Sequence, residues 1–306
     1  MIKDFINIAD FTADQLRGLL ERALADKALF RAGKLVASLP RKSLAMIFEK
    51  PSLRTRVSFE VAMAQLGGHA LYLTQADIGL GKREAIQDIA RVLGRMCNGI
   101  MARTFSHEWV TQLAVHAKVP VVNALTDYSH PCQAMADLMT ATEVFGELEG
   151  RTLTFIGDGN NVARSLATAC GLLGMRFVLN APSGYELSEP FVQALPRPQL
   201  YQWVRDPAEA VKQADVIYTD TWVSMGQENE RAKRLHDLSG YQVNAQLLAK
   251  APAHAVVMHC LPAYRGLEIT DEAFEAHART ILEEAENRLH FQRSLLNVLI
   301  GEGGIR

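Results

Sequence analysis

The sequence has few cysteines and no long apolar run. Its four cysteines lie far apart and form no C-x-x-C pair: Cys97, Cys132, Cys170 and Cys260. Such spacing is typical of reduced thiols and argues against a disulfide framework or a zinc site. No segment reaches the ~18 consecutive apolar residues that a membrane-spanning helix requires. Residues 1–5 include a lysine and an aspartate and begin no apolar signal-peptide core, so we expect a cytoplasmic protein.

The sequence also lacks an excess of charge of either sign. Its 32 lysines and arginines nearly balance its 34 aspartates and glutamates. A broad basic face is therefore not expected, which argues against nucleic acid as the main partner. The 306 residues are 48% hydrophobic and 22% charged, as in globular proteins, and are enough for two domains. Any cationic site must be local, which favours a small-molecule ligand.

Short apolar runs alternate with helical patterns through the first half of the chain. This alternation predicts an α/β fold, in which a parallel sheet is flanked by its crossover helices. We expect strands at Leu44–Phe48, Ala70–Leu73, Gly99–Ala102 and Val119–Asn123, and helices at 54–66, 84–96, 106–117 and about 132–145.

A segment rich in glycine and glutamate, Gly146–Gly150, indicates a domain boundary, after which the alternation restarts. A second parallel sheet flanked by helices is therefore expected. Its strands are predicted at Leu153–Ile156, Phe177–Asn180, Val216–Thr219, Val256–His259 and Thr280–Glu283, before a final helix at about 285–300. We predict two domains, 1–146 and 147–284, and the pattern leaves open which of them the final helix packs on.

The most informative segment is the turn at Phe48–Arg56, between a predicted strand and a predicted helix. A helix N-terminus leaves backbone N–H groups unpaired, and these attract anions. Arg54, Arg56 and two hydroxyl side chains crowd the same turn, and guanidinium groups match phosphate oxygens in pairs. The turn therefore predicts chemistry on a phosphorylated small molecule. A solvated basic turn would have the same local pattern.

Polar residues also follow other predicted strands, at the ends where open parallel sheets bind ligands. Arg103 follows the third predicted strand, although a single arginine there is often only a surface residue. In His130–Gln133 the histidine lies at a helix N-terminus, which disfavours its charged form and suits it to polarise a carbonyl. A structural histidine bonded to the backbone is the equal alternative.

Three motifs follow strands of the second half. Gly157–Asn161 lacks the third glycine of a dinucleotide fingerprint, so its two asparagines predict a helix cap and a polar ligand. Asp220–Gly226 offers either a carboxylate for a bound amine or a capping aspartate beside core residues. His259–Pro262 ends a buried strand, where a lone cysteine is often a small core residue.

Together these motifs resemble those of the aspartate/ornithine carbamoyltransferase family, from Leu44 to Arg288. Pro51–Arg56 and His130–Gln133 are similar to its two carbamoyl-phosphate signatures, and the three motifs of the second half are similar to those of its ornithine-using branch. The resemblance implies transfer of the carbamoyl group of carbamoyl phosphate to the δ-amine of L-ornithine. The products are L-citrulline and phosphate, and no cofactor or metal is implied.

The resemblance also implies roles for individual residues. The residues expected to bind carbamoyl phosphate are Ser52, Leu53, Arg54, Thr55, Arg103, His130, Gln133, Cys260, Leu261 and Arg288. Those expected to bind ornithine are Asn161, Asp220, Ser224 and Met225, with Asp220 on the α-amino group. The expected catalytic residues are Arg103, His130 and Cys260, and the thiol either accepts the amine's proton or only positions the amine.

By the same resemblance, the first domain binds carbamoyl phosphate and receives the helix 285–306, the second binds ornithine, and the chain forms a homotrimer or a multiple of trimers. Gly79 stands where many relatives have a glutamine that reaches a neighbouring subunit, which leaves that contact to Lys82 or Arg83 or weakens it. The alternatives are another amine acceptor such as acetylornithine or putrescine, a non-catalytic amino-acid-binding regulator, and a nucleotide-dependent dehydrogenase.

Overall fold

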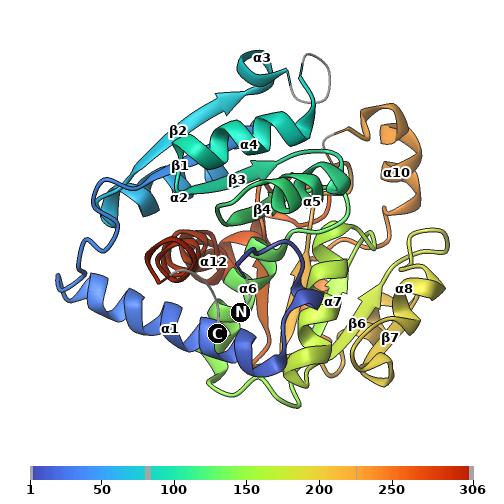
Figure 1. Ribbon diagram of the computed structural model, residues 1–306. Helices are drawn as coiled ribbons and strands as arrows, with labels where there is room; N and C mark the ends of the chain where they lie inside the picture. The colour runs from blue at the N-terminus through green and yellow to red at the C-terminus, as the bar shows by residue number, and fades with distance from the viewer. Residues whose placement is uncertain (1–2, 80–83, 225, 303–306) are drawn as a thin grey trace. The chain divides into compact units, whose positions relative to one another are not determined.

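The computed structural model describes residues 3–79, 84–224 and 226–302. The chain divides into two compact units, unit 1 (Met1–Met139 with Glu286–Arg306) and unit 2 (Thr140–Ala285). Each unit contains one parallel sheet, which confirms the α/β prediction (Figure 1). Within the described ranges, no helix is both long and apolar enough to cross a membrane.

The sheet of unit 1 has the strand order β2-β1-β3-β4, and all its pairs are parallel. The four strands are β1 (Ser43–Phe48), β2 (His69–Thr74), β3 (Gly99–Arg103) and β4 (Val121–Leu125), each close to its predicted place. The helices of this unit are α1 (Ala13–Arg31), α2 (Leu53–Gln65), α3 (Gln75–Ile78), α4 (Ile86–Met96), α5 (His107–His116) and the start of α6 (Pro131–Phe145).

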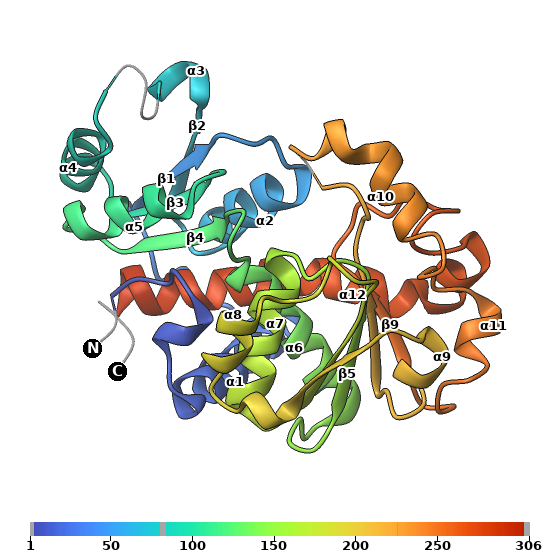
Figure 2. The same cartoon turned by 90° about the vertical axis from the view of Figure 1, so that its right-hand side faces the viewer.

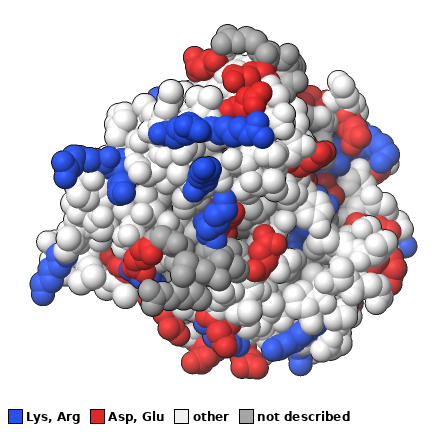
Figure 3. Space-filling view, in the orientation of Figure 1, with Lys and Arg blue, Asp and Glu red and all other residues white. Residues whose placement is uncertain are grey.

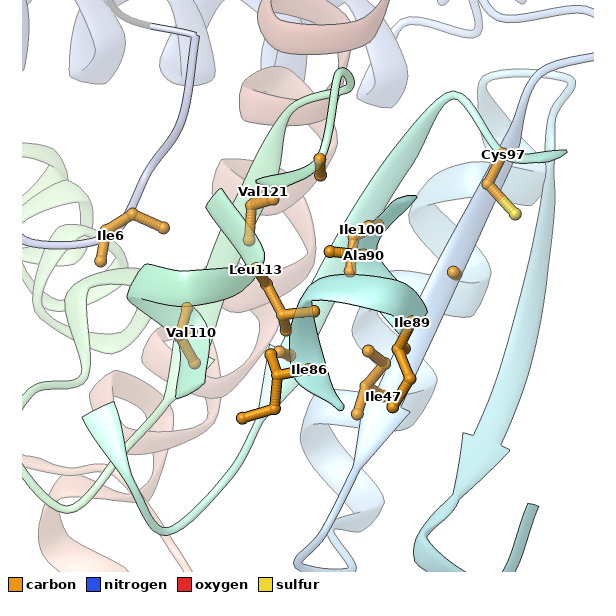
Figure 4. Close-up of a cluster of buried hydrophobic side chains, with 13 residues drawn as sticks. Ile6, Ile47, Ile86, Ile89, Ala90, Cys97, Ile100, Val110, Leu113 and Val121 are labelled. Atoms are coloured by element: carbon orange, nitrogen blue, oxygen red, sulfur yellow. The ribbon is translucent and has the colours of Figure 1, made fainter. Parts of the chain in front are cut away.

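Helices cover both faces of this sheet. Figure 4 shows α4 and α5 packed on one face, where Ile89 and Leu113 join a buried cluster with Ile47 and Ile100 of the central strands. In Figure 2, α2 lies on the opposite side of the sheet from α4 and α5. Because both faces are covered, the central strands are almost continuously apolar, as their sequences predict.

The C-terminal residues of α12 (Asp271–Leu296) belong to unit 1. Lys27 of α1 donates from Nζ to Asn287 Oδ1 at 2.7 Å, and Arg293 donates to Gln65 Oε1 of α2 at 2.7 Å. Lys27 and Arg293 are both fully or almost fully buried. The expectation that the final helix packs on the first domain is therefore confirmed.

The sheet of unit 2 has the parallel order β7-β6-β5-β8-β9. Its strands are β5 (Thr152–Ile156), β6 (Arg176–Asn180), β7 (Tyr201–Val204), β8 (Val216–Thr219) and β9 (Val256–His259). Its helices include α7 (Asn161–Leu173), α8 (Glu189–Gln193), α9 (Pro207–Ala210), α10 (Arg231–Asp237) and α11 (Ala245–Leu248). A buried cluster that includes Ile217, Val257 and Ile269 forms the core beside β8 and β9.

The predicted strand Thr280–Glu283 is wrong, because these residues lie inside α12, which begins at Asp271 rather than near residue 285. The surrounding glutamate, alanine, leucine and arginine residues favour helix strongly enough to include two β-branched residues. Ile281 is fully buried and Leu282 is 57% exposed, which fits a helix with one apolar stripe. The strand that takes its place in the five-stranded sheet is β7, a half-exposed edge strand that the apolar pattern did not predict.

Charges of both signs are interspersed over the face drawn in Figure 3, and no large patch of one sign dominates it. This distribution agrees with the net charge of −2.

Candidate active site

The turn between β1 and α2 is built by a helix cap. Ser52 is the N-cap of α2, and its Oγ accepts a hydrogen bond from the Thr55 N–H at 3.3 Å. The same Oγ–H donates to Thr55 Oγ1 at 3.1 Å. These bonds hold the Thr55 hydroxyl at the first turn of α2, where the helix dipole favours an anion.

Two buried arginines converge on the Thr55 hydroxyl. Arg103, at the end of β3, donates from Nη1 to Thr55 Oγ1 at 3.2 Å. Arg288 of α12 donates from Nη2 to the same oxygen at 3.3 Å, across 233 residues of sequence. Arg103 is 9% exposed and Arg288 is 3% exposed. Two partly desolvated guanidinium groups therefore face the N-terminus of α2.

Gln133 connects this cluster to α6. Arg288 donates from Nη1 to Gln133 Oε1 at 2.6 Å, and Gln133 donates from Nε2 to Asp137 Oδ1 at 2.7 Å. All three side chains are buried. Ser52, Thr55, Arg103, Gln133 and Arg288 thus form one hydrogen-bonded group within unit 1.

His130 lies directly before Pro131, the first residue of α6, and is 4% exposed. Burial lowers the pKa of His130 well below its usual value, and the charges of Arg288, Arg103 and Lys50 lower it further. The imidazole is therefore neutral at neutral pH. A neutral imidazole N–H can donate a hydrogen bond to a carbonyl oxygen without bringing another positive charge into the cluster.

Lys50 is a cation that the sequence analysis did not assign to the site. It is 4% exposed, is ion-paired with Asp127, and lies with its Nζ 4.0 Å from the centroid of the Phe105 ring. The sequence feature that could have assigned Lys50 to the site is its position in the turn just before Ser52. Lys50 adds positive charge beside His130, so it strengthens the field on an anion there.

The other residues of the turn differ in exposure and direction. The side chain of Leu53 is 73% exposed, so only its backbone is available to a ligand held within the cluster. Arg54 is partly exposed. Arg56 donates to Glu60 Oε1 at 2.9 Å and lies 3.9 Å over the Tyr72 ring, so it does not join the group around Thr55.

A second polar group lies in unit 2, around Asp220 after β8. Asp220 Oδ1 accepts from the Thr221 N–H at 2.7 Å and from the Cys260 thiol at 3.0 Å. Its Oδ2 accepts from Asn160 Nδ2 at 2.8 Å. Asp220 is 8% exposed, so these three donors stabilise a nearly buried carboxylate.

The cap of α7 decides which asparagine reaches Asp220. Asn160 is the N-cap, and its Oδ1 accepts from the N–H groups of Val162 and Ala163 at 2.9 and 3.0 Å. Its amide N–H is left to donate to Asp220. Asn161, the predicted ligand residue, accepts instead from the Val162 N–H at 3.0 Å. The paired asparagines were the signal, but sequence alone did not identify Asn160 as the residue beside Asp220.

A buried histidine supports the turn that carries Cys260 and Leu261. His259 Nδ1 accepts from the Leu261 N–H at 2.9 Å, and His259 Nε2 lies 3.1 Å from Glu268 Oε1. Leu261 has a φ of +57°, which is unfavourable for a branched side chain and needs such support. Cys260, Leu261 and Asp220 are thereby brought together at the carboxyl ends of β8 and β9.

Asp220, His259 and Cys260 are also the residues that come closest to a metal site in the described part of the chain. One potential ligand atom from each lies within 4.8 Å of the others. Both ring nitrogens of His259 are already hydrogen-bonded, and Asp220 accepts three hydrogen bonds. This arrangement fits a hydrogen-bonded network better than a metal centre.

The structure describes Thr221–Ser224 of the loop after Asp220, and it describes the chain again from Gly226. Ser224 is partly buried, and its backbone N–H donates to Gln227 Oε1 at 3.1 Å. Met225, Lys82 and Arg83 lie outside the described residues. Gly79 ends α3 with a φ of +62°, a conformation that glutamine would adopt only at a cost.

Arg234 and Asp158 form a further, partly buried contact that the sequence analysis missed. Arg234 of α10 pairs with Asp158 and donates from Nε to the Trp222 carbonyl at 2.6 Å. Burial raises the pKa of Asp158, although Arg234 opposes that shift. The pair connects α10 to the turn after β5, beside the group around Asp220.

Known proteins match the chain over nearly its full length. Residues 3–143 match the family model "Aspartate/ornithine carbamoyltransferase, carbamoyl-P binding domain", and residues 149–299 match "Aspartate/ornithine carbamoyltransferase, Asp/Orn binding domain". The chain is 49% identical to the ornithine carbamoyltransferase of Methanoculleus marisnigri, over 99% of this chain and 98% of that protein. It is 46% identical to the protein of Pyrococcus furiosus named "Ornithine carbamoyltransferase, anabolic", over 98% and 96% of the two chains.

Solved structures give the same result. The ornithine carbamoyltransferase from Pyrococcus furiosus superposes with a TM-score of 0.93 at 46% identity, covering 98% of this chain and 97% of that one. The enzyme of that name from Thermus thermophilus superposes with a TM-score of 0.88 at 43% identity, covering 98% and 99%.

Proposed function

The chain belongs to the aspartate/ornithine carbamoyltransferase family, and we propose that it transfers the carbamoyl group of carbamoyl phosphate to the δ-amine of L-ornithine. The products are L-citrulline, an intermediate of arginine biosynthesis, and phosphate. The observation that carries this proposal is the convergence of Arg103 and Arg288 on Thr55 at the N-terminus of α2. That group offers the donors and charge that an acyl phosphate requires.

In this proposal, unit 1 binds carbamoyl phosphate. The phosphate oxygens accept hydrogen bonds from Ser52, Arg54, Thr55 and the backbone of Leu53. Arg103 and Arg288 neutralise their charge, and both arginines are already desolvated, so their attraction to an anion is stronger than it would be in bulk water.

The carbamoyl group lies beside His130 and Gln133 in the same proposal. Neutral His130 and Arg103 donate hydrogen bonds to the carbamoyl oxygen, which becomes negative as the tetrahedral intermediate forms. A preorganised donor of this kind contributes roughly 3 kcal/mol of transition-state stabilisation in other enzymes. The lowered pKa of His130 supports this role because the donor is available without a net charge.

Unit 2 binds ornithine, with Asp220 accepting from the α-ammonium group and Asn161, Ser224 and Met225 completing the subsite. The δ-ammonium group must lose a proton, which costs roughly 4 to 5 kcal/mol at neutral pH for an amine of ordinary pKa. Cys260 donates its S–H to Asp220 at 3.0 Å, and a thiolate there would face a carboxylate. This contact favours a positioning role for Cys260 with Leu261 rather than proton acceptance.

The test of the proposed function is an acceptor panel. Carbamoyl phosphate is offered with ornithine, acetylornithine, putrescine, lysine or aspartate, and the ureido product is measured by colour. We expect ornithine to give the highest kcat/KM by a wide margin. A higher value for another amine would assign a different acceptor. If none of them gives a ureido product, the non-catalytic regulator is the function that remains.

We also propose that the chain forms homotrimers, or multiples of trimers, in the cytoplasm. Leu53 and Val57, which lie one turn apart on α2, are 73% and 48% exposed. Apolar side chains grouped in this way favour a protein partner. The four free cysteines agree with a reducing compartment. Sedimentation equilibrium at several concentrations tests the assembly, and cell fractionation tests the location.

A further inference from the structure

Asp137 is a buried carboxylate that the proposed reaction does not yet use. It lies one helical turn after Gln133 on α6, and both residues are 1% exposed. Burying a carboxylate is unfavourable unless strong donors satisfy it. Asp137 Oδ1 accepts from Gln133 Nε2 at 2.7 Å, a short bond that ties the two side chains together.

This bond selects one of two orientations of the Gln133 amide. The oxygen and nitrogen ends of an amide have nearly the same shape, so packing alone selects neither. Asp137 as a carboxylate is acceptor-only and admits only the NH2 end of the amide. The guanidinium of Arg288 is donor-only and admits only the oxygen, which it reaches at 2.6 Å. Asp137 and Arg288 therefore favour the same orientation.

We propose that Asp137 is a positioning residue that turns Gln133 Oε1 toward the carbamoyl group, so that this oxygen accepts from the carbamoyl NH2. The inference rests on the proposed function, because it assumes that carbamoyl phosphate binds beside Gln133. Without Asp137, only Arg288 holds the amide, so the orientation that presents an NH2 group to the carbamoyl NH2 is populated more often. Asp137 thus contributes to selectivity for carbamoyl phosphate over an acyl phosphate that lacks the N–H donor.

The experiment compares three anions that share a phosphate group and differ in what is attached to it. Carbamoyl phosphate has the NH2 group, acetyl phosphate has a methyl group in its place, and inorganic phosphate has neither. Their dissociation constants are measured for the wild type, Asp137→Leu, Asp137→Asn and Gln133→Ala, and for the Gln133→Ala/Asp137→Leu double variant. Circular dichroism checks that each variant is folded.

We expect Asp137→Leu to weaken carbamoyl phosphate about 10-fold while acetyl phosphate and phosphate change by less than about 3-fold. Asp137→Asn keeps an acceptor for the Gln133 amide, so it should lose less. In the Gln133→Ala background, Asp137→Leu should have no further effect on carbamoyl phosphate. Equal weakening of all three anions, or an undiminished effect without Gln133, would overturn the inference.

If Asp137→Leu does not fold, a charge exchange decides the matter. Gln133→Glu alone places two carboxylates together and should weaken carbamoyl phosphate. The Gln133→Glu/Asp137→Asn pair restores an NH2 group facing a carboxylate oxygen and should recover most of the affinity. Absence of recovery contradicts the inference. Wild-type protein that does not bind carbamoyl phosphate at all would instead refute the proposed function.

Discussion

At the scale of single residues, two side chains each accept hydrogen bonds from several donors within their own unit. The Thr55 hydroxyl accepts from Arg103 and Arg288, which lie on different elements. The Asp220 carboxylate accepts from a backbone N–H, an amide and a thiol. Because all these groups are buried or nearly buried, removing the shared acceptor takes one hydrogen bond from each of several donors.

Thr55→Val keeps the shape of the side chain and removes its hydroxyl. We expect the KM for carbamoyl phosphate to rise about 10- to 100-fold, since each hydrogen bond to a charged group contributes about 1.5–3 kcal/mol. The KM for ornithine should change little. Steady-state kinetics check this, and Thr55→Ser, which keeps the hydroxyl, is the matched control. A normal KM for carbamoyl phosphate in the valine variant would remove Thr55 from the proposed site.

Asp220→Asn replaces an acceptor-only group with an amide that faces three donors. We expect kcat/KM for ornithine to fall by about 100-fold, because the α-ammonium group loses its counter-charge and one donor meets another NH2. Binding of carbamoyl phosphate, measured separately, should be unchanged. If any activity with 5-aminopentanoate, which keeps the carboxylate but lacks the α-amino group, falls by the same factor, the proposed recognition of the α-amino group is wrong.

At the scale of elements, helix caps position residues at the start of several helices. Asn160 caps α7 and at the same time donates to Asp220, so its cap and its site contact are not separable. Thr12 caps α1 in a capping box with Gln15, far in sequence from any proposed ligand residue. The two caps therefore allow stability and function to be tested apart.

Thr12→Ala removes the side-chain half of the capping box of α1. The Gln15 N–H then loses the hydrogen bond that it donates to Thr12 Oγ1 at 3.2 Å. We expect the free energy of unfolding to fall by about 1 kcal/mol, with kcat and both KM values unchanged. Urea denaturation and kinetics measure the two effects, and Thr12→Ser serves as the control. An equal loss in the serine variant would show that the cap is not the cause.

At the scale of the whole molecule, buried and half-buried histidines make the stability depend on pH. Burial lowers the pKa of His130 well below its usual value, with help from nearby cations, and burial also lowers the pKa of His107, His277 and His290. Below about pH 6.5 the unfolded chain binds protons on these residues more readily than the folded chain does. The free energy of unfolding should therefore decrease as the pH falls below about 6.5.

His130→Asn isolates the largest of these contributions. We expect the slope of unfolding free energy against pH to become smaller by up to about 1.4 kcal/mol per pH unit between pH 6.5 and 5. Above about pH 7.5 the two slopes should coincide, because His130 is then neutral in both states. Urea titrations at half-unit steps of pH measure the difference. An identical slope in both proteins at low pH would mean that His130 is protonated in the folded state.

Local signals in the sequence were sufficient for most of the elements. The strands of unit 1 and the helices between them were predicted because apolar period and turn residues act over a few neighbouring positions. At Thr280–Glu283 two β-branched residues favoured a strand while the surrounding residues favoured a helix. The strand prediction there was wrong, because these residues lie inside α12. The edge strand β7 was missed because it is half exposed and has no continuous apolar run.

The sequence by itself determined the two α/β units, the strand-to-helix turn at Phe48–Arg56 and the residue types that follow the strands. Only the tertiary structure decided which of these residues touch. The contact of Arg288 with Thr55 spans 233 residues, and it forms because α12 packs in unit 1. The roles of Asn160, Lys50 and Asp137 likewise depend on donor and acceptor positions, which are set by packing between elements and leave no periodic pattern in the chain.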